Sequence, residues 1–131
     1  ENKGIALNCA GDALVIGSDT LLYRLVFNLV ENAIRYSRPD STVNVSICDN
    51  DSHVFLRVED QGPGIPRQYR ESIFQPFFRL DTSRSRAYGG AGLGLALVWE
   101  IAALHGGTVE VETSSENGTV MLVTLSKGAT T

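Results

Sequence analysis

The sequence has little of what marks secreted, membrane-spanning or nucleic-acid-binding proteins. It contains only two cysteines, Cys9 and Cys48, which are too far apart for a CxxC motif. We therefore expect a reduced, intracellular chain without disulfide bonds. No run of about 18 apolar residues is present, and no signal-peptide pattern opens the chain. The net charge of −4 and the absence of a lysine- or arginine-rich run argue against a nucleic-acid partner.

The length and composition fit one ordinary globular domain. The chain has 131 residues, of which 43% are hydrophobic and 20% are charged, and both values are typical of a single soluble domain. We therefore interpret residues 1–131 as one domain. Because the chain begins at Glu1 rather than at a methionine, we expect it to be a segment of a longer protein.

Hydrophobic periodicity and turn residues predict an α+β fold. Strands are expected at residues 4–9, 13–17, 42–48, 53–59, 108–112 and 119–125, the first two as a hairpin around Gly11-Asp12. Helices are expected from about residue 19 to Ser37, briefly from Pro66 onward, and over 93–105, where Gly106-Gly107 can end the helix. The prediction is one sheet of roughly six strands with helices in a second layer.

The first predicted helix carries the motif NLVENAIRY at residues 28–36. At about 100° per residue, Asn28, Asn32, Arg35 and Tyr36 share one face, next to an apolar stripe that must pack on the sheet. Amide oxygens can bind Mg²⁺, an arginine can bind phosphate, and a tyrosine ring can lie beside a base. The motif therefore indicates a nucleotide site at the rim of a groove. The alternative is a solvated helix face with scattered asparagines.

The loop DQGPGIP follows a predicted strand. Asp60, at the end of that strand, can accept a hydrogen bond from an exocyclic amine, which would select adenine over guanine. Gly62 and Gly64 allow the backbone to approach a ligand closely. Because Asp-x-Gly is also a common turn sequence, a purely structural loop is the alternative.

A third motif, GGAGLGLAL at residues 89–97, follows a long polar segment, RLDTSRSRAYGGAG. Gly90, Gly92 and Gly94 open a helix whose free N–H groups attract anions. The spacing matches neither the Rossmann fingerprint nor a Walker A loop. A phosphate site and a flexible hinge are both compatible with the motif, and a polar segment of this length is usually functional or mobile.

Taken in order, NLVENAIRYS, DQGPGIP, IFQPFFR and GGAGLGLAL closely resemble the four nucleotide-binding boxes of sensor histidine kinases. Over nearly its whole length the chain resembles the catalytic, ATP-binding domain of these bacterial two-component proteins, within the superfamily shared with gyrase, Hsp90 and MutL. The resemblance implies a Bergerat fold. This is a two-layer α/β sandwich with a mixed sheet, about three helices on one face and a mobile lid over ATP.

The resemblance also implies roles for individual residues. Asn28 and Asn32 would face magnesium and the phosphates, and Arg35 and Arg79 would contact phosphate, with Asn28 and Arg79 as the catalytic pair. The glycine-rich lid hinge and phosphate loop would comprise Gly90, Gly92, Leu93, Gly94 and Leu95.

At the adenine end, the resemblance implies that Asp60 binds the adenine amine and that Tyr36 lies against the ring. Four further residues would shape this end of the pocket: Gly62, Gly64, Ile65 and Thr119. Phe77 and Phe78 match the phenylalanine box of the family, although they could equally belong to the core.

The implied reaction is transfer of the γ-phosphate of Mg-ATP to a histidine on a separate dimerisation domain of the same kinase, with a response regulator downstream. An amide at Asn28 cannot act as a general base, whereas ATP-hydrolysing members of the superfamily have a glutamate there. We expect His53 and His105 to be structural or solvent-exposed. The chain alone should then bind ATP as a monomer without phosphorylating itself.

The resemblance places the domain at the cytoplasmic end of an inner-membrane sensor kinase, without membrane contact of its own. Two other functions within the superfamily stay open. One is an anti-sigma-type kinase that phosphorylates serine, and the other is a non-catalytic module in which ATP gates a conformation.

Overall fold

The computed structural model describes residues 6–11, 19–75 and 94–127. Five strands form one mixed sheet in the order β1-β2-β3-β5-β4. They are β1 (Ala6–Ala10), β2 (Thr42–Asp49), β3 (His53–Asp60), β4 (Thr108–Ser115) and β5 (Gly118–Ser126). Strand β1 runs parallel to β2, and the other neighbouring strands are antiparallel.

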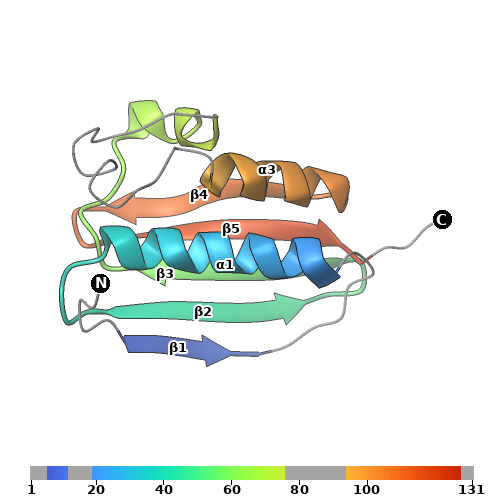
Figure 1. Ribbon diagram of the computed structural model, residues 1–131, viewed down its shortest axis with the longest axis horizontal. Helices are drawn as coiled ribbons and strands as arrows, with labels where there is room; N and C mark the ends of the chain where they lie inside the picture. Colours follow the sequence, from blue (N-terminus) through green and yellow to red (C-terminus); the bar gives the residue numbers. More distant parts are fainter. Residues whose placement is uncertain (1–5, 12–18, 76–93, 128–131) are drawn as a thin grey trace.

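In the described part of the chain, two α-helices, α1 (Asp19–Tyr36) and α3 (Gly94–Leu104), pack against each other and against the sheet and lie in a second layer on one face (Figure 1). Two short 3-10 helices, η1 (Arg67–Tyr69) and η2 (Ser72–Phe74), follow β3. They occupy the place where the sequence predicts a short helix from Pro66. The predicted two-layer α+β architecture is confirmed, while the predicted strand at 13–17 and the predicted lid lie outside the described residues.

The core lies between the helices and the inner face of the sheet. On α1 the sheet-facing positions Leu25, Leu29 and Ala33 are all at most 3% exposed, as the apolar stripe in the sequence predicts. On β5 every second residue from Thr119 to Leu125 is buried, and β3 shows the same alternation. The period of two fixes the register of these strands, because a slip by one residue would turn their apolar side chains outward.

Helix α3 ends where the sequence predicts. Gly106 has a φ of 70°, a conformation that costs glycine little and other residues more. A Cβ on Gly107 would lie 1.8 Å from the carbonyl oxygen of Thr124, so only a glycine lets the chain pass this close to β5. The two glycines therefore stop the helix and direct the chain into β4.

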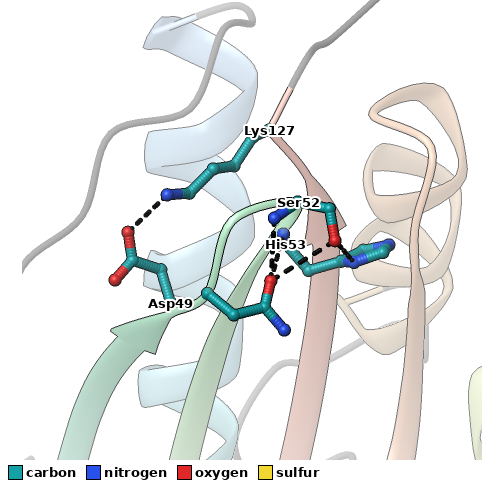
Figure 2. Close-up of polar contacts among 5 residues, drawn as sticks. Asp49, Ser52, His53 and Lys127 are labelled. Carbon is teal, nitrogen blue, oxygen red and sulfur yellow. Dashed lines mark hydrogen bonds and ion pairs between the residues drawn. The ribbon is translucent and has the colours of Figure 1, made fainter.

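The turn between β2 and β3 is held by the side chain of Asn50, whose Oδ1 accepts hydrogen bonds from the N–H groups of Ser52 (2.9 Å) and His53 (2.8 Å) (Figure 2). Nearby, Lys127 Nζ lies 2.6 Å from Asp49 Oδ2 and ties the end of β5 to this turn. His53 and Asp60 occupy opposite ends of β3, about 23 Å apart along the strand. His53 therefore belongs to a structural cluster far from Asp60.

Candidate functional site

Asp60 ends β3 with its carboxylate inside the molecule, and the residue is only 7% exposed. Its Oδ1 accepts two backbone hydrogen bonds, one from the N–H of Gly62 at 2.9 Å and one from the N–H of Thr119 at 3.2 Å. No hydrogen bond within the described part of the chain uses Oδ2. The carboxylate is thus fixed through one oxygen, and the other oxygen keeps its capacity to accept a hydrogen bond.

Burial raises the pKa of the Asp60 carboxyl above its usual value, because desolvation disfavours the charged form. The two backbone N–H donors and the positive charge of Arg38 oppose this shift, and the neighbouring Glu59 adds to it. Within the described residues this buried carboxyl has two donors on one oxygen and none on the other, so a polar ligand could donate to the second oxygen.

Glycines bring the loop after β3 into contact with its neighbours. A Cβ on Gly62 would lie 2.2 Å from the carbonyl oxygen of Tyr36, and one on Gly64 would lie 2.2 Å from the carbonyl oxygen of Ser115. Gly64 also has a φ of 89°, which favours glycine. From the sequence, we expect these glycines to let the backbone approach a ligand closely. The structure shows that they also seat the loop between α1 and the β4–β5 hairpin.

Thr119 is buried, 3% exposed, on β5 beside Asp60. Its hydroxyl forms a hydrogen bond of 2.7 Å with the Ser114 hydroxyl, which also accepts a bond of 2.8 Å from the N–H of Ile65. Arg70 donates to the carbonyl oxygens of Ile65 (3.0 Å) and Ser114 (3.2 Å). The structure thus brings Asp60, Thr119 and Ile65 together through Ser114 and Arg70, which sequence reasoning missed.

Arg38 is a third residue that sequence reasoning missed. It lies just after α1, and its guanidinium donates to the carbonyl oxygens of Gln61 (2.9 Å), Gly62 (3.2 Å) and Glu116 (2.7 Å). These acceptors lie up to 78 positions away along the chain. A pattern of side chains cannot reveal such contacts, because the acceptors are main-chain groups that every residue type carries.

The residues of α1 divide into three faces. Leu25, Leu29 and Ala33 face the sheet and are buried, whereas Tyr23, Phe27 and Glu31 are exposed. The four residues predicted to bind the nucleotide have intermediate burial: Asn28, Asn32, Arg35 and Tyr36. They therefore lie at the rim between core and solvent, as the helical wheel of the sequence predicts.

Asn28 carries an unpaired polar group. Its Nδ2 is buried and has no hydrogen-bond partner in the described part of the chain. A buried polar group without a partner usually lowers the stability of the folded state by about 1–3 kcal/mol. The amide orientation follows from the surroundings and is not directly observed, so either its nitrogen or its oxygen lacks a partner there. A polar ligand that reaches this point of α1 would satisfy the group.

The rise of α1 sets the spacing of the candidate site. Tyr36 touches the Asp60 loop through Gly62, and at 1.5 Å per residue Asn32 and Asn28 lie about 6 Å and about 12 Å back along the helix. In Figure 1 the C-terminal ends of α1 and β3 and the N-terminal ends of α3 and β5 all lie at the left of the molecule. A ligand bound at Asp60 could therefore extend along the polar face of α1.

Two candidate residues open α3. A Cβ added at Gly94 would meet no atom of the described residues outside its own turn of helix within 4 Å, and Leu95 packs partly buried against the core. Leu95 therefore supports the core, whereas a side chain at Gly94 would contact none of the other described elements. The remaining candidates lie outside the described residues: Phe77, Phe78, Arg79, Gly90, Gly92 and Leu93.

Two negative findings concern the described residues alone. They contain no group of three or more histidine, cysteine or acidic side chains placed to hold a metal ion, and no helix with the length and hydropathy to span a membrane.

The asparagine amides of α1 are neutral oxygen donors. Such donors suit a magnesium ion that takes its other ligands from phosphates and water, so Asn28 and Asn32 fit the ion that the sequence implies.

An open groove of about 860 Å³ lies elsewhere, between η2, α3 and β4, lined in part by Phe74, Trp99 and Val111. Among the predicted site residues that the structure describes, none lines this groove. Because Asp60 is a buried carboxylate with one oxygen unused within the described part of the chain, we consider the Asp60 end of the sheet the candidate site.

Comparison with known proteins gives one consistent result. The family model described as "Histidine kinase-, DNA gyrase B-, and HSP90-like ATPase" matches residues 17–129. The sensor protein RstB of Escherichia coli (strain K12) is 50% identical over 98 residues, which are 75% of this chain and 22% of RstB. The chain thus spans less than a quarter of the length of that relative.

Solved structures agree with this match. The mycobacterial sensor histidine kinase MprB has 34% sequence identity and a TM-score of 0.82, with 95% of this chain and 83% of that chain covered. Full-length ShkA, solved in complex with AMPPNP, has 26% identity and a TM-score of 0.80, with 98% of this chain and 27% of that chain covered.

Proposed function

The chain belongs to the family of histidine kinase-, DNA gyrase B- and HSP90-like ATPases and, within it, to the catalytic domains of sensor histidine kinases, and we propose that it binds Mg-ATP and transfers the γ-phosphate to a histidine on a separate dimerisation domain. One observation carries the proposal. The half-satisfied Asp60 carboxylate lies at the end of the polar face of α1, because the Gly62 backbone touches the carbonyl oxygen of Tyr36.

At the adenine end, Asp60 Oδ2 accepts a hydrogen bond from the exocyclic amine of adenine. Guanine has a carbonyl oxygen at the same ring position, and two facing acceptors repel each other, so the site prefers ATP to GTP. Tyr36 lies against the base, and Ile65 and Thr119 shape this end of the pocket. The complex of ShkA with AMPPNP supports the assignment of an adenine nucleotide.

At the phosphate end, the triphosphate extends along α1 toward Asn32 and Asn28. The unpaired Asn28 amide supports this direction, since the ligand would satisfy a polar group that is otherwise buried alone. Magnesium, when bound, neutralises phosphate charge, and the amides of Asn28 and Asn32 would hold it. We propose that Arg35 and Arg79 contribute positive charge, and that Gly90, Gly92, Leu93 and Gly94 close over the phosphates.

The transfer step requires no general base from this chain. A nitrogen of the acceptor imidazole forms a bond to the γ-phosphorus as the bond from that phosphorus to the β–γ bridging oxygen breaks. ADP leaves with the electron pair, and the imidazole proton passes to solvent. The chain therefore acts by holding the nucleotide in line and by stabilising charge. An amide at Asn28 cannot activate water, which disfavours hydrolysis of ATP.

The partners follow from this reaction. The acceptor histidine lies on the helical dimerisation domain of the same kinase, and a response regulator takes the phosphate downstream. We propose that the domain works in the cytoplasm, at the inner end of a membrane-bound sensor.

The test uses labelled ATP and the 131-residue chain, with and without a helical domain that carries the acceptor histidine. We expect acid-labile phosphate on the added domain and none on the chain alone. Acid-labile phosphate on His53 or His105 would contradict the proposal. Stable phosphoserine on a small partner would favour a serine kinase, and ATP binding without any transfer would favour a gating module.

A further inference from the structure

Arg38 joins three segments that are far apart in the sequence. It follows α1, and its Nη1 donates to the carbonyl oxygens of Gln61 and Gly62, in the loop after β3, at 2.9 and 3.2 Å. Its Nη2 donates to the carbonyl oxygen of Glu116, in the β4–β5 turn, at 2.7 Å. A guanidinium suits this arrangement, because its planar fork can reach several acceptors at fixed angles.

The first acceptor belongs to the peptide group that holds Asp60. The carbonyl of Gln61 and the N–H of Gly62 form one planar peptide group. Arg38 binds its oxygen, and its N–H donates to Asp60 Oδ1 at 2.9 Å. A cation on the carbonyl side polarises the peptide and strengthens the hydrogen bond that its N–H donates.

The third acceptor belongs to the segment that carries the other donor to Asp60. Glu116 lies in the turn that leads into β5, and the N–H of Thr119 donates to the same Oδ1 at 3.2 Å. Both backbone donors to Asp60 therefore lie on segments that one arginine holds. The guanidinium fixes which way the free oxygen of the carboxylate points.

We propose that Arg38 is a positioning residue for base recognition, acting through the Gln61–Gly62 peptide and the β4–β5 turn to hold Asp60 ready for the adenine amine; this inference rests on the proposed function. Within the described residues, the hydrogen-bond acceptors of the Arg38 guanidinium all lie at the base end of the site, in the loop after β3 and in the β4–β5 turn. Loss of Arg38 should therefore weaken the binding of ATP and leave the binding of GTP unchanged.

The electrostatics support the same role. Among the described residues, the charged groups that act on Asp60 are Glu59, which raises its pKa, and Arg38, which lowers it. Removing Arg38 takes away one of the influences that lower this pKa, so the carboxyl should take up a proton at a higher pH. A protonated carboxyl is a poorer acceptor for an amine.

The test compares Arg38→Gln and Arg38→Lys with a matched control, Arg24→Gln, which removes an exposed arginine of α1. Affinity for ATP and GTP is measured by titration in the presence of Mg²⁺, and folding is checked by thermal unfolding. We expect Arg38→Gln to lose about tenfold in ATP affinity with GTP affinity unchanged, Arg38→Lys to recover part of the loss, and Arg24→Gln to match the unchanged chain.

A second measurement uses adenosine, which has no phosphates to titrate. As the pH is lowered, adenosine binding to the Arg38→Gln chain should weaken at a higher pH than adenosine binding to the unchanged chain. Unaltered ATP affinity in Arg38→Gln would overturn this inference. So would an equal loss of affinity for ATP and GTP with a lower unfolding temperature. Neither result would contradict the proposed function. Failure of the unchanged chain to bind ATP would remove the proposed function and the inference with it.

Discussion

Gly62 and Tyr36 bring the loop after β3 into direct backbone contact with the end of α1. A Cβ on Gly62 would lie 2.2 Å from the Tyr36 carbonyl oxygen and 3.3 Å from Asp60 Oδ1. The contact places Asp60 next to the polar face of the helix. Two motifs more than twenty residues apart in the sequence are therefore neighbours in the structure, as the proposed function requires.

Gly62→Ala should therefore destabilise the domain, because the added methyl group meets main-chain atoms that cannot move independently of the helix and sheet. We expect a loss of about 1–3 kcal/mol in the free energy of unfolding, measured by denaturant titration. Gly94→Ala is the matched control. An alanine at Gly94 meets no atom within 4 Å in the other described elements, so stability should stay within about 0.5 kcal/mol. Equal effects of the two substitutions would contradict the contact.

Asp60→Asn should weaken ATP binding by about tenfold to a hundredfold, since a bond to a charged acceptor is lost and the new amide can present a donor to the adenine amine. Asparagine can still accept from the N–H groups of Gly62 and Thr119, so the fold should persist. ATP titration checks the affinity, with circular dichroism as the control for folding. Unchanged ATP affinity would remove Asp60 from the site.

The pKa of Asp60 also predicts how stability depends on pH. Burial raises the folded-state pKa, so the folded protein holds this proton more tightly than the unfolded chain, whose value is about 3.9. The stabilisation is fully present below about pH 3.9 and is lost as pH rises through the higher folded-state pKa. Relative to wild type, Asp60→Asn should therefore gain stability as pH rises through this range. Parallel stability–pH curves for the two proteins would contradict the shift.

Asn28→Ala should reduce the effect of Mg²⁺ on ATP affinity without lowering the stability of the folded chain. The buried Nδ2 has no partner to lose among the described residues, so the unfolding temperature without nucleotide should stay the same or rise. The gain in ATP affinity on adding Mg²⁺ should shrink, because an oxygen ligand or phosphate contact is lost. Glu31→Ala, on the exposed face of the same helix, is the control and should keep the full magnesium effect. A full magnesium effect in Asn28→Ala would exclude a role at the phosphate end.

Much of the architecture could be predicted from the sequence, because periodicity and turn residues are local signals. The stripe of Leu25, Leu29 and Ala33 predicts α1, and Gly106-Gly107 predicts the end of α3. Motif order further predicts which residues form the site. The structure brings Asp60, Gly62 and Thr119 into contact, although their roles toward a nucleotide stay predictions.

The supporting contacts could not be predicted in the same way. Arg38, Arg70 and Ser114 bind main-chain groups from distant segments, and these acceptors have no signature in the sequence. The parallel pairing of β1 with β2 also escaped prediction, because alternation identifies a strand without naming its neighbour. The irregularity between Val111 and Thr113 in β4 left no signal in the sequence either.

The most direct test is a crystal structure of the chain with Mg²⁺ and a nonhydrolysable ATP analogue. We predict that the adenine amine lies within hydrogen-bonding distance of Asp60 Oδ2 and that the triphosphate extends along α1 past Asn32 to Asn28. An analogue bound away from Asp60, or bound there with its phosphates pointing away from α1, would contradict the account.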